Sequence, residues 1–425
     1  MASAKFRVMY VLLLYLQFII IDISGERVRY DGYEVLRLDI HSEQHIEALK
    51  TVQDSGKYDF WHYPNHVMTS PTHKQELVRS LELNDIDYDI WIEDVQQLID
   101  NYSPDTRTTT TAQDDYDYSV YHTYAEIDQW VKDTAARYPT LAKEFVIGSS
   151  YENRVMRALK VGSESSEVKP AMWVHSGIHA REWVTPATNT WMTNQLLVDY
   201  STNDLVRTLL DTFDFYILPI TNPDGYEYTW TDDRMWRKTR SVNDDSTCIG
   251  VDPNRNWAYE WGGSGASKFP CFDTYRGPYP HSEVEVRNVA DFILERAKTQ
   301  EFVFFMDIHS YSQMWLNPWG YTEEYPEDYD DHMKVGEIFT EAVASVHGQQ
   351  YTYGTIPDLL YVSSGCSVDW GHGIMGIKYS HTTELRDTGE YAFLLPEDQI
   401  IPTAQETYAG FVAAYEHIMN ERVSS

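Results

Sequence analysis

The pattern His-x-x-Glu can place an imidazole and a carboxylate on one metal ion, and it occurs three times in this chain. The pairs are His73 and Glu76, His179 and Glu182, and His381 and Glu384. A catalytic zinc site takes three protein ligands from histidine and carboxylate and leaves one position for water. Each pair could supply two of these ligands, so the surrounding elements must decide between them.

The position of each pair in its element favours the second one. The first pair lies in an N-terminal region that is expected to be removed. The third lies on a predicted strand, where residues three apart point to opposite faces. The second follows a buried apolar run at 171–174 and Gly177, which predicts a loop at the carboxyl end of a strand. Active sites of open α/β sheets gather at such ends.

A third ligand is expected from another strand end. The apolar run 302–308 leads directly into His309. His179, Glu182 and His309 therefore form a candidate zinc set, although the pattern alone also allows three hydrogen-bonded structural residues. The zinc-protease signature His-Glu-x-x-His is absent from the sequence.

Alternating apolar runs and amphipathic stretches after residue 121 predict an α/β domain of about 300 residues with a largely parallel or mixed sheet. The strongest predicted strands are 170–174, 213–220, 302–308 and 377–383. The predicted helices between them include 123–138, 186–202 and 282–299.

The first 25 residues are typical of a signal peptide. Lys5 and Arg7 precede an apolar run over 9–21, which is too short for a span of about 20 residues. No later segment is long enough to span a membrane. We therefore expect an exported, soluble protein, with a retained signal anchor as the alternative.

Residues 26–107 read as a small α+β unit that precedes a linker. Strand-like patterns at 33–40 and 88–92 flank a helix-like pattern at 42–54, and a polar run without apolar periodicity follows at 103–115. Arg107 lies in that run, where a trypsin-like protease could separate the unit from the rest. This organisation predicts a zymogen.

Three cysteines and a strongly acidic charge fit an exported enzyme. We expect one disulfide between Cys248 and Cys271, with three free thiols as the alternative, and Cys366 is left over. Asn101 begins an N-glycosylation sequon whose occupancy the sequence does not decide. The formal net charge of −33 argues against a nucleic-acid partner, because binding a polyanion requires Lys and Arg.

Five sequence blocks resemble the pancreatic-type zinc metallocarboxypeptidases, the carboxypeptidase A and B family. They are 179–183, 233–240, 250–257, 309–313 and 383–389, in the order of that family. The resemblance implies a mixed eight-stranded sheet flanked by helices over 108–425, after a propeptide over 26–107 that covers the active site. It also implies one Zn²⁺ on His179, Glu182 and His309, and a disulfide matching Cys248 and Cys271. Cys366 stands where carboxypeptidase A has a glycine.

The resemblance assigns two catalytic residues. Glu384 matches the general base that takes a proton from water and passes it to the leaving amine. Its alternative is a structural ion pair with Arg386. Arg237 matches the residue that stabilises the charge of the tetrahedral intermediate. The basic run at 234–240 would otherwise be read as a solvated face.

Recognition of a peptide C-terminus is assigned by the same resemblance. Asn254 and Arg255 match a clamp for the terminal carboxylate, for which an arginine fork is well shaped. Tyr361 matches a mobile cover over bound substrate, and Arg181 matches a residue that binds further up the peptide. We expect a monomer whose partners are peptide and protein C-termini.

The base of the side-chain pocket matches Val368, which predicts release of aliphatic and aromatic residues, because an unpaired buried ammonium would cost several kcal/mol. Gly320 is expected to keep the pocket open, between walls from Ile356, Leu360 and Thr382. A shift by one residue to Asp369 would instead predict specificity for Lys and Arg. A catalytically silent peptide-binding relative is the other alternative.

Overall fold

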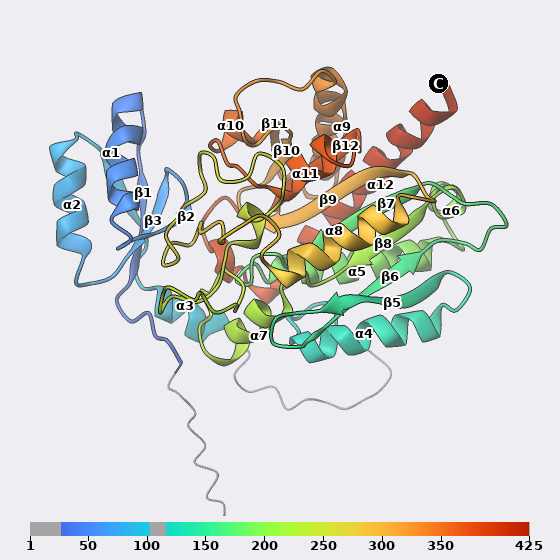
Figure 1. Cartoon of the computed structure of the whole chain (residues 1–425), viewed down its shortest axis with the longest axis horizontal. Helices are drawn as coiled ribbons and strands as arrows, with labels where there is room; N and C mark the ends of the chain where they lie inside the picture. Colours follow the sequence, from blue (N-terminus) through green and yellow to red (C-terminus); the bar gives the residue numbers. More distant parts are fainter. Residues whose placement is uncertain (1–26, 103–115, 425) are drawn as a thin grey trace, which may run out of the picture.

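The computed structural model describes residues 27–102 and 116–424, and its first part forms a small α+β unit (Figure 1). Its elements are β1 (Glu34–Leu38), α1 (Glu43–Asp54), β2 (Asp59–His62), β3 (His66–Thr69), α2 (Lys74–Leu83), β4 (Tyr88–Ile92) and α3 (Val95–Tyr102). The sheet is antiparallel, in the order β2-β3-β1-β4. Ser42 caps α1 by accepting a hydrogen bond from the amide of His45. We refer to this unit as the leader.

The second part is built on one mixed sheet of eight strands, as expected. The strand order is β11-β10-β12-β9-β7-β8-β6-β5. The inner strands β12, β9, β7 and β8 run parallel to one another, and the outer pairs bring in antiparallel neighbours. The strands are β5 (Ala142–Ser149), β6 (Val155–Val161), β7 (Ala171–Ser176), β8 (Asp214–Leu218), β9 (Phe302–Ser310), β10 (Met314–Asn317), β11 (Thr352–Thr355) and β12 (Tyr379–Leu385).

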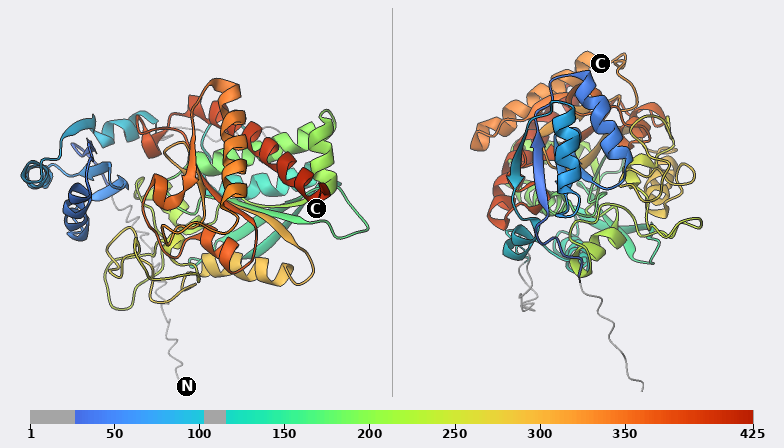
Figure 2. Two further views of the ribbon diagram at one scale, coloured as in Figure 1. Left: turned by 90° about the horizontal axis from the view of Figure 1, so that it is seen from above. Right: turned by 90° about the vertical axis from the view of Figure 1, so that its left-hand side faces the viewer.

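Helices cover both faces of this sheet (Figures 1 and 2). One face packs against α4 (Tyr124–Arg137), α5 (Val184–Asp199), α6 (Asp204–Thr212), α9 (Tyr329–His347) and α12 (Ile400–Ser424). The other packs against α8 (Val284–Arg296) and α11 (Ser367–Gly373). The inner strands are apolar on both sides: in β7, Met172 and Val174 face the first layer, and Ala171 and Trp173 face the second.

The remaining short elements lie in the connections between these strands and helices. They are α7 (Pro223–Thr231), α10 (Ile356–Leu359) and the 3₁₀ turns η1 (Pro253–Arg255), η2 (Ala392–Leu394) and η3 (Glu397–Gln399).

Several sequence predictions concern parts outside the described residues. The proposed signal peptide (1–25) and the linker with Arg107 lie there, as does Ser103 of the sequon. Cys248 and Cys271 form the expected disulfide, and Cys366 is a buried free thiol. None of the described helices is long and apolar enough to cross a bilayer.

Candidate active site and metal centre

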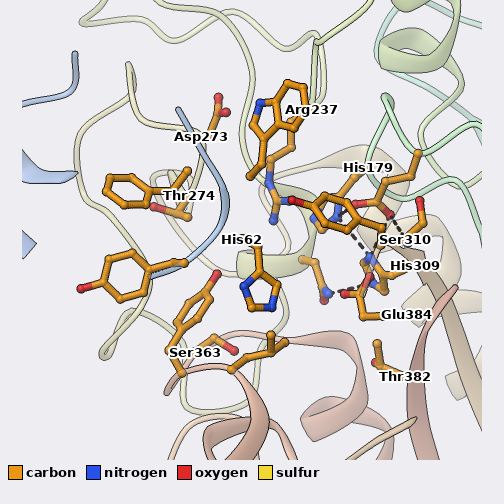
Figure 3. Close-up of a pocket in the computed structure, with 18 of the residues that line it drawn as sticks. His62, His179, Arg237, Asp273, Thr274, His309, Ser310, Ser363, Thr382 and Glu384 are labelled. Atoms are coloured by element: carbon orange, nitrogen blue, oxygen red, sulfur yellow. Dashed lines mark hydrogen bonds and ion pairs between the residues drawn. The ribbon is translucent and has the colours of Figure 1, made fainter. Parts of the chain in front are cut away.

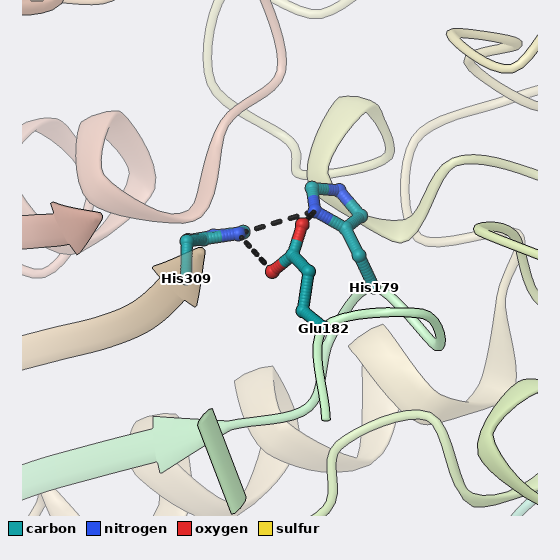
Figure 4. A group of neighbouring side chains, drawn as sticks. All are labelled: His179, Glu182 and His309. Atoms are coloured by element: carbon teal, nitrogen blue, oxygen red, sulfur yellow. Dashed lines mark hydrogen bonds and ion pairs between the residues drawn. The ribbon is translucent and has the colours of Figure 1, made fainter. Parts of the chain in front are cut away.

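Two imidazoles and one carboxylate meet at the carboxyl ends of the central strands (Figure 4). His179 and Glu182 lie in the loop after β7, and His309 is near the end of β9. His179 Nδ1 is 2.7 Å from Glu182 Oε1, and His309 Nδ1 is 3.1 Å from Glu182 Oε2. One ligand atom from each residue lies within 4.8 Å of the other two, and all three side chains are buried. The structure thus brings together the set that the sequence singled out.

A further carboxylate stands behind each imidazole. Asp252 Oδ1 lies 3.1 Å from His179 Nε2, and Asp307 Oδ2 lies 3.0 Å from His309 Nε2. Because an ionised carboxylate only accepts hydrogen bonds, His179 donates from Nε2 and turns the lone pair of Nδ1 toward Glu182. A lone pair facing a carboxylate needs a cation or a second proton between them. Imidazoles backed by carboxylates are typical of zinc ligands, so this donor set fits Zn²⁺.

The other two His-x-x-Glu pairs do not form such a group. His73 is the N-cap residue of α2 in the leader, where Glu76 binds Lys57. On β12, Glu384 lines the active-site cavity, whereas His381 packs against the ring of His332. Because side chains alternate along the strand, His381 and Glu384 point to opposite faces of β12, as predicted.

Glu384 lies beside His309 in the β12–β9 register and lines the same cavity (Figure 3). Its Oε2 has no hydrogen-bond partner in the described chain. Burial raises the pKa of this carboxyl to about 8, and Glu182 acts in the same direction. A divalent cation on the neighbouring ligands would act in the opposite direction. Arg386 pairs with Glu406, so the structural alternative for Glu384 is wrong.

Arg237 lies in the wall of the same cavity, with 14% of its side chain exposed. Its Nη2 donates to Asp252 Oδ2 over 2.9 Å, and its Nε donates to the same oxygen over 3.2 Å. Asp252 therefore fixes both a guanidinium and the imidazole of His179. A cation held in this way can act on a developing negative charge without reorganising.

Asn254 and Arg255 enter the cavity from the 3₁₀ turn η1. Arg255 Nη2 donates to the Tyr361 hydroxyl over 2.9 Å, and Asn254 Nδ2 is 3.1 Å from His309 Nε2. The amide of Ser367 donates to Asn254 Oδ1, which fixes the orientation of the Asn254 side chain. An amide and a guanidinium pointing into one cavity are suited to bind a carboxylate.

An apolar recess continues the cavity, whose volume is about 110 Å³. Val368 and Ile356 line it and are buried together with Cys366, and Leu360 and Thr382 add to the wall. Burial raises the pKa of the Cys366 thiol to about 11, so the thiol is neutral.

Two neighbours of the recess, Gly320 and Asp369, bear on its space and its charge. A Cβ atom added at Gly320 would lie 3.1 Å from Ile356 Cδ1, so a larger residue there would crowd the wall. The Asp369 carboxylate accepts hydrogen bonds from the amides of Gly320 and Tyr321, over 2.8 and 3.0 Å. Val368, and not Asp369, is the residue of this pair that lines the cavity.

The leader reaches into the same cavity. Asp59 Oδ2 accepts from Arg181 Nη1 over 2.7 Å, and the ring of Tyr63 packs edge-on against Tyr361, 5.5 Å between centroids. His62 also lines this cavity (Figure 3). Groups expected to bind substrate therefore contact the leader in this structure.

Sequence reasoning missed several residues of this site. Asp252 and Asp307 support the imidazoles, and Asp59 and His62 come from the leader. Asp252 lies inside the block 250–257, and Asp307 precedes His309 by two residues. Those two positions were the available signal, but a single carboxylate has no spacing pattern of its own.

The family comparisons agree with this geometry. Residues 127–410 match the zinc carboxypeptidase family, and residues 36–102 match the carboxypeptidase activation peptide. Carboxypeptidase A2 of Mus musculus is 42% identical over 397 residues, covering 91% of this chain and 94% of the relative. Carboxypeptidase B of Astacus astacus is 46% identical over 295 residues, covering 69% of this chain and 95% of the relative.

Two solved structures share the fold over 92% of this chain and 99% of their own. Thrombin activatable fibrinolysis inhibitor superposes with a TM-score of 0.80 at 34% identity, and carboxypeptidase A from Helicoverpa armigera with 0.83 at 26%. With both family regions matched and the ligand geometry present, this chain belongs to the zinc carboxypeptidase family and carries that family's activation peptide.

Proposed function

We propose that this zinc carboxypeptidase is secreted as a monomeric zymogen and releases aliphatic and aromatic residues from peptide C-termini. The observation that carries the specificity is the apolar recess. Val368 lies in its wall, and the one carboxylate next to Val368 in the sequence is engaged by two backbone amides. A substrate ammonium or guanidinium would find no partner at Val368.

His179, Glu182 and His309 would hold one Zn²⁺, and the fourth position would take water. In such a site Zn²⁺ lowers the pKa of bound water toward about 7 and polarises a carbonyl. Glu384 would accept the proton of that water on its unpartnered Oε2 and pass it to the leaving amine. Arg237, held by Asp252, would stabilise the negative charge that develops on the carbonyl oxygen.

Asn254 and Arg255 would bind the terminal carboxylate, and Tyr361 would close over it. In support, Arg255 and Tyr361 both line the cavity and share a hydrogen bond. Arg181 would bind a more distant part of the peptide. Its contact with Asp59 of the leader explains why the uncut chain should be inactive. Cleavage near Arg107 by a trypsin-like protease would release the leader.

The specificity test compares kcat/KM on matched peptides that end in Phe or Arg after cleavage with trypsin. We expect the Phe-ended peptide to be preferred, and Val368→Asp to shift the ratio toward the Arg-ended one. Val368→Ala is the matched control and should keep the preference for apolar residues. A wild-type preference for Arg would instead support a basic-residue carboxypeptidase. Bound zinc without cleavage of either peptide would support a silent relative.

A further inference from the structure

A second group of two imidazoles and one carboxylate lies where the start of α9 meets the end of α11. Asp328 is the N-cap residue of α9, His332 lies in the first turn of that helix, and His372 is in the last turn of α11. One ligand atom from each residue lies within 4.8 Å of the other two. Figure 1 shows α9 and α11 at the same end of the sheet. We call these three residues the α9–α11 cluster.

The carboxylate of the α9–α11 cluster faces both imidazoles. Asp328 Oδ1 lies 3.1 Å from His332 Nε2 and 3.5 Å from His372 Nε2. Asp328 makes no side-chain cap to its helix, although aspartate at this position usually does. Two ligands on a tetrahedral ion with bonds of 2.0–2.1 Å lie about 3.4 Å apart, so both contacts already have the spacing of shared coordination.

The hydrogen bonding of His372 points to a cation. His372 Nδ1 lies 3.3 Å from the carbonyl oxygen of Ile377, which can only accept a hydrogen bond. The neutral ring therefore carries its proton on Nδ1 and turns the lone pair of Nε2 toward Asp328. Two acceptors then face each other, as at His179 and Glu182.

His332 and its neighbour His381 each have a ring nitrogen without a partner among the described residues. This side chain is fully buried, and its Nδ1 has no hydrogen-bond partner in the described chain. The ring of His381 packs edge-on against it with 5.0 Å between centroids, and His381 Nε2 is likewise without a partner. Since His381 Nδ1 contacts Asn317 Oδ1, Nε2 carries a lone pair.

We propose that Asp328, His332 and His372 bind a second divalent transition-metal ion, of which Zn²⁺ is the class member best suited to two imidazoles and a carboxylate. Imidazole disfavours Ca²⁺ and Mg²⁺, which prefer oxygen. The side chains of Asp328 and His372 are 25% and 14% exposed, so an ion can enter from solvent and retain a water ligand. The observations that carry this site are independent of the proposed substrate specificity.

An ion in the α9–α11 cluster would brace the recess rather than act on substrate. It would join the start of α9 to α11, the helix that carries Val368. His372 also packs against Trp319, 4.7 Å between ring centroids, and Trp319 precedes Gly320. Binding to the folded chain alone raises its stability by mass action.

The test measures zinc bound per full-length zymogen after equilibration with buffered free Zn²⁺. We expect two ions in the wild type and one in His372→Gln. The side chain of His372 is partly exposed, so the fold should tolerate this substitution. His347→Gln, on the same helix α9 but outside the cluster, is the matched control and should keep two. His309→Ala should keep the α9–α11 ion, and the double variant His309→Ala/His372→Gln should bind none.

Thermal unfolding gives a second reading. Added Zn²⁺ should raise the unfolding midpoint of His309→Ala but not of the double variant. One ion in the wild type and an unchanged one in His372→Gln would overturn the proposal and leave the cluster as a hydrogen-bonded group. One ion in the wild type that His372→Gln abolishes would instead overturn the catalytic ligand set and keep the second site.

Discussion

The two groups of imidazoles and carboxylate differ mainly in what stands behind their histidines. At the catalytic centre, Asp252 and Asp307 contact the outer nitrogens of His179 and His309. In the α9–α11 cluster, a backbone carbonyl contacts His372. A carboxylate makes the imidazole a stronger donor to a metal than a carbonyl does. Two imidazoles and one carboxylate can therefore bind zinc with different affinities. We expect the catalytic centre to bind it more tightly than the α9–α11 cluster.

The surroundings of the two groups also indicate that the first is catalytic and the second structural. Beside the catalytic ligands, Glu384 and Arg237 line a cavity; Glu384 Oε2 has no hydrogen-bond partner in the described chain, and Arg237 is held by Asp252. The α9–α11 cluster is instead bounded by aromatic rings, those of Trp319 and His381. A metal can activate water at either place, but only the first has a general base and a cation placed for a substrate.

The largest expected effect is a loss of catalysis that leaves both metal-ligand groups intact. Glu384→Gln should lower kcat at least about a hundredfold, because the general base is lost while the shape is kept. The amount of bound zinc should not change. Steady-state kinetics of the trypsin-cleaved variant, with metal analysis of the same sample, checks this. A variant of wild-type activity would contradict the role given to Glu384.

The next effect tests the outer carboxylates. Asp252→Asn should weaken zinc at the catalytic centre by about 10–100-fold, as loss of such partners does elsewhere. The α9–α11 ion should be unaffected, because Asp252 contacts His179 and Arg237 only at the first group. Competition titration with a chelator measures both affinities in one sample. Equal weakening at both sites would indicate a general loss of structure instead.

A smaller effect is the order in which the ions leave. During titration of the wild type with a chelator, the α9–α11 ion should go first, with a fall of a few degrees in the unfolding midpoint and little loss of activity. Activity should fall only with the second ion. Simultaneous loss of activity and of the first ion would mean that the cluster binds more tightly than its carbonyl partner suggests.

The smallest expected effect is a pH dependence of stability that comes from a buried carboxyl outside both metal-ligand groups. Glu285 on α8 accepts a hydrogen bond from the amide of Tyr151, and burial, with Glu283 and Asp224 adding negative charge, raises its pKa to about 8. The folded state therefore keeps this proton between about pH 4.5 and 8 while the unfolded state loses it. Stability from this group is lost as pH rises through that window, by up to about 1.4 kcal/mol per pH unit.

Glu285→Gln removes this titration and should flatten the pH dependence of the unfolding midpoint between about pH 5 and 8. Glu295→Gln, an exposed change on the same helix, is the control. An unchanged slope in Glu285→Gln would show that Glu285 is ionised in the folded protein.

Prediction from the sequence worked where chemistry follows a local pattern. His179, Glu182 and His309 were accessible because each follows a predicted strand. Residues assigned by resemblance, such as Arg237 and Tyr361, also come to the same cavity. The resemblance assigned Val368 to the recess and left a shift to Asp369 open. The fold separates the two residues, because neighbours on a helix point about 100° apart and only Val368 lines the cavity.

The α9–α11 cluster shows what local patterns miss. Asp328 and His332 have the spacing of one helical turn, which is common on solvated helices. His372 is forty residues further on, and nothing in the sequence places it beside them. Only the packing of α9 and α11 against the sheet brings the three together.

The pairing of β12 with β9 sets Glu384 opposite His309 and Thr382 opposite Asp307. The same alternation sends His381 to the other side, against His332. Inserting or deleting one residue in β12 would turn each of these side chains to the wrong face at once. A change in the length of this strand would therefore displace residues beside both ligand groups at once.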